Sequence, residues 1–288
     1  MLAGCPGRTL ISQQARVYLD DKTLARSGMM NLRVVLVEPM YDGNIGSVAR
    51  AMKNFGFDQL VLVNPCRIDD FGNAMASHAK DILDKAKVVA TLEEAVRESC
   101  LVIGTTGKRL GDEHKHLRLH IREPWLTPAQ LVDKLNGKDC EVSLLLGRET
   151  WGLTNQELQL CNLLVSIPTS NLYPVMNIAQ AATILLYELS QVEPGNVAMA
   201  GPETLERLQV SARGLLDEIN YPSHKREFRM TMFKRIFGRA ELTEREANTL
   251  LGMLKLLRWQ VNNRKRQGNT IKQSEGSSTS CSCSQDQS

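Results

Sequence analysis

Three segments of this 288-residue chain combine glycines, amides and charges in patterns that suit ligand binding. The first runs from Glu38 to Arg50, with the sequence EPMYDGNIGSVAR. Gly43 and Gly46 permit close backbone approach, and the start of the following helix offers unpaired N–H groups to an anion. The spacing matches neither the dinucleotide-binding glycine motif nor the phosphate-binding P-loop. Arg50, about one and a half turns into this helix, is either a functional cation or a solvated surface charge.

The second segment, LLLGRETWGLT, spans residues 144–154 and begins with an apolar run that ends at a glycine. Gly147 would let a ligand lie against the backbone at this point. Arg148 and Glu149 follow it and are either functional charges or a local ion pair. Thr154 stands where the N-cap of the next helix belongs.

The third segment, IPTSNLYPVMNIAQAA, spans residues 167–182 and again joins an apolar run to a helix. Ile167 and Met176 could line the apolar side of a pocket for a flat ring. The helix that starts near Asn177 carries three alanines in its first turns. These small side chains suit either a dimer interface or ordinary core packing.

The apolar patterns between the segments predict the scaffold that positions them. Six runs are continuously apolar, as expected of parallel strands covered on both faces: residues 34–37, 60–63, 87–90, 101–104, 142–146 and 164–167. Helical periodicity fills the gaps, and Asn44 stands at the predicted N-cap of the first helix. We therefore expect an α/β fold, an open and mostly parallel six-stranded sheet with helices on both faces. Because ligands of such sheets bind at the carboxyl ends of the strands, the three segments should meet in one site.

Composition divides the chain into a main domain and appended segments. The main domain is expected at residues 31–190, after a disordered N-terminal extension at 1–30. Residues 191–203 contain two prolines and two glycines with little periodicity, which is typical of a linker. A small helical, basic extension follows at 204–266, and a disordered Ser- and Gln-rich tail at 267–288.

Whole-chain properties narrow the class of protein. The formal net charge is only +3, and no apolar run approaches the roughly 20 residues that span a bilayer. The first residues lack the basic start and apolar block of a secretory signal. Seven cysteines without a framework spacing suit a reducing compartment. These features predict a cytoplasmic protein without membrane contact.

The three segments together resemble the motifs of the TrmH (SpoU) branch of the SPOUT RNA methyltransferases. The first family motif, N-x-G-x-x-A-R, is matched by Asn44, Gly46, Ala49 and Arg50. The second, G-x-E-x-x-G-L, is matched by Gly147, Glu149, Gly152 and Leu153, and the third by Pro168, Asn177 and Ala179. The likeness runs from about residue 33 to 189. It resumes at residues 235–240 and 248–254, which resemble the C-terminal extension of the TrmJ-type tRNA 2′-O-methyltransferases.

This resemblance implies a C-terminal trefoil knot, an exception to the rule that connections do not thread. It also implies S-adenosylmethionine bound in the knot, with Arg50 as the catalytic residue and Asn44 holding its loop. A homodimer would form through the knot and the helix at Asn177–Leu189. The implied cofactor-binding residues are Thr105, Thr106, Gly107, Gly147, Ile167, Pro174, Val175 and Met176.

The resemblance further implies a tRNA substrate, methylated at cytidine or uridine 32 on the 5′ side of the anticodon loop. Basic segments after the fourth strand and in the C-terminal extension suit phosphate contacts, and solvated charge is their alternative explanation. The predicted substrate contacts are Arg109, Lys115, Arg118, Arg148, Glu149, Tyr173, Asn177, Lys234 and Arg235. No metal is expected, because His114, His116 and His120 lack a carboxylate or cysteine to complete a ligand set.

One departure from the family pattern concerns the proton. Bacterial relatives commonly carry Ser-Leu-Asn where this chain has Val175-Met176-Asn177, so a hydroxyl is missing and Tyr173 or Ser170 would substitute. Arginine stays protonated and is a poor base, so Arg50 is expected to hold a phosphate and stabilise developing alkoxide. Three alternatives stay open: a ribosomal RNA 2′-O-methyltransferase, a catalytically inactive knotted RNA-binding protein, and a nucleotide-binding enzyme without either glycine motif.

Overall fold

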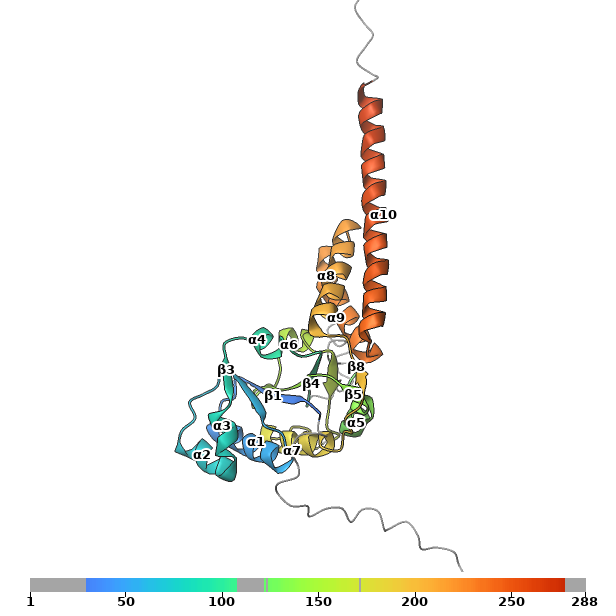
Figure 1. The fold of residues 1–288 in the computed structure, drawn as a ribbon. Helices are drawn as coiled ribbons and strands as arrows, with labels where there is room; N and C mark the ends of the chain where they lie inside the picture. Colours follow the sequence, from blue (N-terminus) through green and yellow to red (C-terminus); the bar gives the residue numbers. More distant parts are fainter. Residues whose placement is uncertain (1–29, 108–121, 123, 171, 278–288) are drawn as a thin grey trace, which may run out of the picture.

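The computed structural model describes residues 30–107, 122, 124–170 and 172–277 (Figure 1). Its main sheet has the strand order β3-β2-β1-β6-β4-β7, and each neighbouring pair is parallel. The strands are β1 (Leu32–Val37), β2 (Gln59–Val63), β3 (Lys87–Val89), β4 (Leu101–Thr105), β6 (Val142–Leu146) and β7 (Leu163–Val165). The predicted open, parallel six-stranded sheet is confirmed, with each strand within two residues of its expected bounds.

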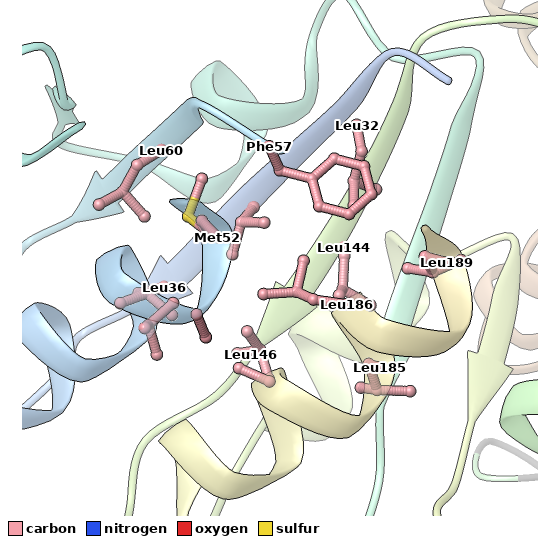
Figure 2. Packing of buried hydrophobic residues seen from close by; sticks show 14 of the residues in the cluster. Leu32, Leu36, Met52, Phe57, Leu60, Leu144, Leu146, Leu185, Leu186 and Leu189 are labelled. Carbon is pink, nitrogen blue, oxygen red and sulfur yellow. The ribbon is translucent and has the colours of Figure 1, made fainter. Parts of the chain in front are cut away.

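Helices cover both faces of this sheet, which explains the continuously apolar strands. One face carries α1 (Asp42–Asn54), α3 (Lys80–Asp84), α5 (Pro128–Leu135) and α7 (Ile178–Leu189), and the other carries α4 (Leu92–Val96) and α6 (Asn155–Gln159). Alternate residues of β1 point to opposite faces: Leu36 packs in the first core and Val35 in the second. In the first core, Leu185, Leu186 and Leu189 of α7 pack near Leu144 and Leu146 of β6 (Figure 2).

Helix α1 begins three residues before the predicted position. Its N-cap is Tyr41, and Asn44 lies within the first turn. The helix packs closely against α2 (Asp70–Ala76). A Cβ on Gly46 would lie only 2.0 Å from the carbonyl oxygen of Gly72, so this contact requires a glycine. The Asp42 carboxylate accepts the Gly72 N–H at 2.8 Å and ties the start of α2 to the start of α1.

The segment predicted as a linker is tied to the rest of the fold at several points. Within it, β8 (Val197–Ala198) pairs with β5 (Lys138–Asp139). The backbone of Ala200 then donates to the carbonyl of Leu242 at 2.8 Å. A strand of two residues is too short to leave a periodic pattern in the sequence, so composition alone could not predict it.

Three helices make up the C-terminal part: α8 (Pro202–Glu218), α9 (Ser223–Ala240) and α10 (Glu244–Ser277). They share a small apolar core that includes Leu208, Leu242 and Leu251. Helix α10 extends far beyond the sheet (Figure 1) and continues into the segment predicted as a disordered tail. Nowhere in the described residues is a helix long and apolar enough to cross a membrane.

Candidate active site

A pocket opens at the carboxyl ends of β4, β6 and β7, where the loops that follow these strands meet. All eight residues that the family resemblance implies for the cofactor line it: Thr105, Thr106, Gly107, Gly147, Ile167, Pro174, Val175 and Met176. They come from three loops that the sheet brings together because β4 lies between β6 and β7. Two of the three predicted segments, 144–154 and 167–182, therefore meet at this pocket together with the loop after β4, whereas the first segment, 38–50, contributes no lining residue.

One side of this pocket was not predicted. Ile178, Ala181 and Leu185 of α7 line it, and their spacing of three and four residues places them on one helical face. That periodicity was visible in the sequence, but core packing explained it equally well. Arg122 also lines the pocket; its guanidinium donates to the carbonyl oxygen of Leu153 at 3.2 Å.

The three segments are joined by a hydrogen-bonded chain of Asn44, Glu149 and Asn177. The Asn44 amide donates to the Glu149 carboxylate at 2.9 Å and accepts from the Asn177 amide at 3.1 Å. Glu149 also accepts the backbone N–H groups of Met40 and Tyr41, at 3.0 and 3.3 Å. Glu149 thus holds the first loop against the second, and Asn177 adds the third while capping α7 through the Ala179 N–H.

Arg148, predicted as a substrate contact, is a buried structural residue instead. Its side chain is 7% exposed and donates to Glu38 at 2.8 Å and to both oxygens of Glu157 at 2.9 and 3.0 Å. These hydrogen bonds, first that to Glu157, raise the pKa of Arg148 further above its ordinary value. Burial alone would raise the pKa of Glu157, but bonds from Arg148 and Thr154 outweigh it and leave that pKa lowered. With its donors occupied, Arg148 is corrected from RNA contact to support of the loop.

The glycine at the start of this loop has a different role from the one expected. A Cβ on Gly147 would lie 2.3 Å from the backbone of Gly152 and Leu153, so the loop closes on itself at Gly147. Gly147 is therefore required by the turn, whereas Gly107 and Gly152, which also line the pocket, have no described atom within 4 Å of their Cβ positions.

Arg50, the predicted catalytic residue, lies on α1 outside the pocket lining. It is exposed and makes no hydrogen bond or ion pair with any residue that the structure describes. Tyr173 is 80% exposed and also lies outside the lining. An exposed guanidinium in this position is available to an external anion.

The C-terminal pair Lys234 and Arg235, predicted to contact RNA, faces the main domain instead. Arg235 is 2% exposed and donates to the carbonyl of Leu158 at the end of α6. Lys234 is partly covered, and burial lowers the pKa of both side chains. We therefore reassign Arg235 to anchoring α9. Sequence reasoning missed this because the same basic pattern fits an exposed helix face.

Some predicted residues cannot be placed. Arg109, Lys115 and Arg118 lie outside the described residues, as do the histidines at 114, 116 and 120. Within the described part of the chain, no three His, Cys, Asp or Glu side chains are grouped to hold a metal ion.

Comparison with known proteins agrees with this architecture. Residues 31–187 match the SpoU rRNA Methylase family. The chain is 38% identical over 232 residues to the tRNA (cytidine-2′-O-)-methyltransferase TrmJ of Methanocaldococcus jannaschii, covering 78% of this chain and 98% of that protein. It is 35% identical to the tRNA (cytidine/uridine/adenosine-2′-O-)-methyltransferase TrmJ of Pseudomonas aeruginosa, covering 77% and 92%. Among solved structures it is similar to TrmJ from Z. mobilis, with a TM-score of 0.63 and 28% identity over 78% of this chain and 98% of that one. The chain therefore belongs to the SpoU methylase family.

Proposed function

We propose that this protein transfers a methyl group from S-adenosylmethionine to a ribose 2′-hydroxyl of tRNA. The observation that carries the proposal is that all eight residues implied for the cofactor by the family resemblance line one pocket. These residues fit the cofactor chemically. Ile167, Ile178 and Leu185 offer an apolar wall for a flat adenine ring, and the loop at residues 105–107 offers hydroxyls and open backbone for its polar groups.

When bound, S-adenosylmethionine would supply an activated methyl group for the ribose 2′-oxygen. The protein must align the hydroxyl and favour the loss of its proton. Arg50 suits the second task, because its exposed guanidinium can hold the adjacent phosphate bidentately and stabilise negative charge on the oxygen. Asn44, fixed by Glu149 and Asn177, holds the helix start that carries Arg50.

The relatives favour tRNA as the substrate, with the 5′ side of the anticodon loop (position 32) as the proposed target. Two named tRNA 2′-O-methyltransferases are similar to this chain over more than three quarters of its length. Ribosomal RNA is the second candidate, since the matching family is described by rRNA methylation. We assign the phosphate contacts of α9 to its exposed basic residues Lys225 and Arg229, in place of Lys234 and Arg235.

We further propose a cytoplasmic homodimer that forms through α7. Its exposed side chains Gln180, Thr183 and Tyr187 lie on one face, away from the core residues Leu185 and Leu186. Tyr187, which is 54% exposed, gives this face an aromatic side chain that a second copy would cover.

Methyl transfer from radiolabelled S-adenosylmethionine to total tRNA and, separately, to ribosomal RNA tests the function. Alkali-resistant label at a 2′-O position of the anticodon loop is the expected result. Label in ribosomal RNA alone would mean that the substrate is ribosomal RNA and not tRNA, and the proposed methyl transfer would stand. Cofactor binding without label in either RNA would contradict the enzymatic role, and loss of label in Arg50→Ala provides the matched control.

A further inference from the structure

Trp151 stands out among the residues that line the pocket. It lies in the loop between β6 and α6 and is the only aromatic residue in the described lining. Its side chain is 53% exposed, so it forms part of the pocket rim. The sequence motif did not require it, because this position lies between the matched glutamate and glycine of the second motif. Its exposure and position both call for a physical explanation.

The surroundings of Trp151 hold its loop in place. The guanidinium carbon of Arg148 lies 5.9 Å from the centre of the Trp151 ring, within the range of a cation–π contact. Arg148 is itself clamped by Glu38 and Glu157. The next residue, Gly152, adopts a φ of +69° and packs against Gly147. An exposed ring on a loop that is fixed in this way loses little conformational entropy when it binds a partner.

The connectivity of a nucleotide determines what can reach this rim. The ribose carbon that bears the 2′-hydroxyl is bonded directly to the carbon that bears the base. When the hydroxyl enters the pocket, the base of the same nucleotide must therefore lie at the pocket mouth. In the described lining, Trp151 and Val175 are the large apolar side chains that are more than half exposed. Of the two, Trp151 offers a flat aromatic surface.

We propose that the indole of Trp151 is the platform on which the base of the methylated nucleotide stacks. This inference rests on the proposed function and adds a binding determinant to it. Proteins that bind unpaired nucleotides stack their bases on aromatic side chains. Such stacking tolerates different bases because every base has a π face. The platform therefore selects an unstacked nucleotide and leaves base identity to other contacts.

A cycle of protein and RNA changes tests this platform directly. Methylation is measured for wild type and Trp151→Ala on two anticodon stem-loop RNAs, one normal and one with an abasic ribonucleotide at the target. The abasic RNA keeps the ribose hydroxyl and removes only the stacking partner. We expect Trp151→Ala to lower kcat/KM about tenfold on normal RNA, in the range for one stacked base, and to leave the abasic rate unchanged. Trp151→Phe should restore most of the activity.

Two controls distinguish base stacking by Trp151 from other roles of this residue. Trp259→Ala changes a tryptophan on α10 of similar exposure, 58%, and should leave the abasic-to-normal ratio at the wild-type value. The dissociation constant of S-adenosylmethionine should change less than twofold in Trp151→Ala. An equal loss of kcat/KM on both RNAs in Trp151→Ala, or no loss on either, would overturn the stacking proposal. Methylation by the wild type in the same experiment would still support the proposed function. If the wild type binds S-adenosylmethionine and methylates no RNA, both the proposed function and the stacking proposal that rests on it are contradicted.

Discussion

Replacing Arg148 by Met removes the cation that holds the second loop of the site. The variant keeps a side chain of similar length but leaves the Glu157 carboxylate, which is 15% exposed, without its bidentate partner. Removing one partner of a buried ion pair costs about 3–5 kcal/mol. Glu157 still accepts the Thr154 N–H at 2.7 Å, so we expect a loss of about 2–3 kcal/mol. That corresponds to a decrease in Tm of roughly 4–12 °C for a domain of this size.

The pH dependence of this loss of stability tests whether it comes from the unpaired Glu157 carboxylate. The folded protein holds the pKa of Glu157 below its ordinary value of 4.5. Its carboxylate therefore adds stability above the unfolded pKa, and that contribution is lost as the pH falls through the folded pKa. In the Arg148→Met variant, the unpaired charge is removed when Glu157 takes up a proton. The stability difference between wild type and variant should be largest at neutral pH and shrink below pH 4.5.

Thermal unfolding followed by circular dichroism at pH 7 and pH 4 measures both effects. Glu38→Gln is the matched control, because Glu38 is 45% exposed and its pair with Arg148 should contribute only about 0.2–1 kcal/mol. A Tm for Arg148→Met within 2 °C of wild type would refute the assignment of Arg148 as a buried support. A difference of equal size at both pH values would refute the role given to Glu157.

Three further changes test the site, the scaffold and the RNA surface. Arg50→Ala should lower kcat at least 100-fold, the lower range for lost electrostatic stabilisation, with cofactor affinity and Tm unchanged; unchanged turnover would remove Arg50 from the mechanism. Gly46→Ala places a methyl group 2.0 Å from the Gly72 oxygen and should cost about 1–3 kcal/mol of stability, whereas a wild-type Tm would show that α2 can move aside. Reversing the exposed charges in Lys225→Glu and Arg229→Glu should weaken tRNA binding and flatten its dependence on salt, and an identical salt slope would exclude α9 from the RNA surface.

The scaffold could be predicted because its causes are local in the sequence. Continuously apolar runs such as Val142–Leu146 mark strands that are buried on both faces. Caps mark the helix starts: Thr154 forms a capping box with Glu157, and Thr243 accepts the N–H of Glu246. The first helix was placed wrongly because Asn44 has the residue type of an N-cap, while its side chain is bonded to Glu149 instead. A distant partner outweighed the local preference.

The roles of the charged residues depended on partners that sequence spacing does not reveal. Arg148 pairs with Glu38, 110 positions away, and Arg235 donates to Leu158, 77 positions away. Both arginines belong to patterns that suit RNA contacts, and only the fold shows that they are buried. Lys225 and Arg229 lie on α9, like Arg235, and carry the same charge, but they are exposed. Charge pattern therefore predicts where a basic segment lies, and burial decides which of its members can reach RNA.

The site divides its residues into those that fix the loops and those that face the ligand. Glu149 and Arg148 use their polar atoms on other loops of the protein, so their substitution should act through the position of the pocket rather than through direct contact. Trp151 lines the same pocket, with its ring against the guanidinium of Arg148 and more than half exposed. The buried Arg148–Glu157 pair therefore supports the ring that we propose as the stacking platform. Loss of Arg148 should reduce the discrimination between normal and abasic RNA, because it loosens the ring that we propose to make that discrimination.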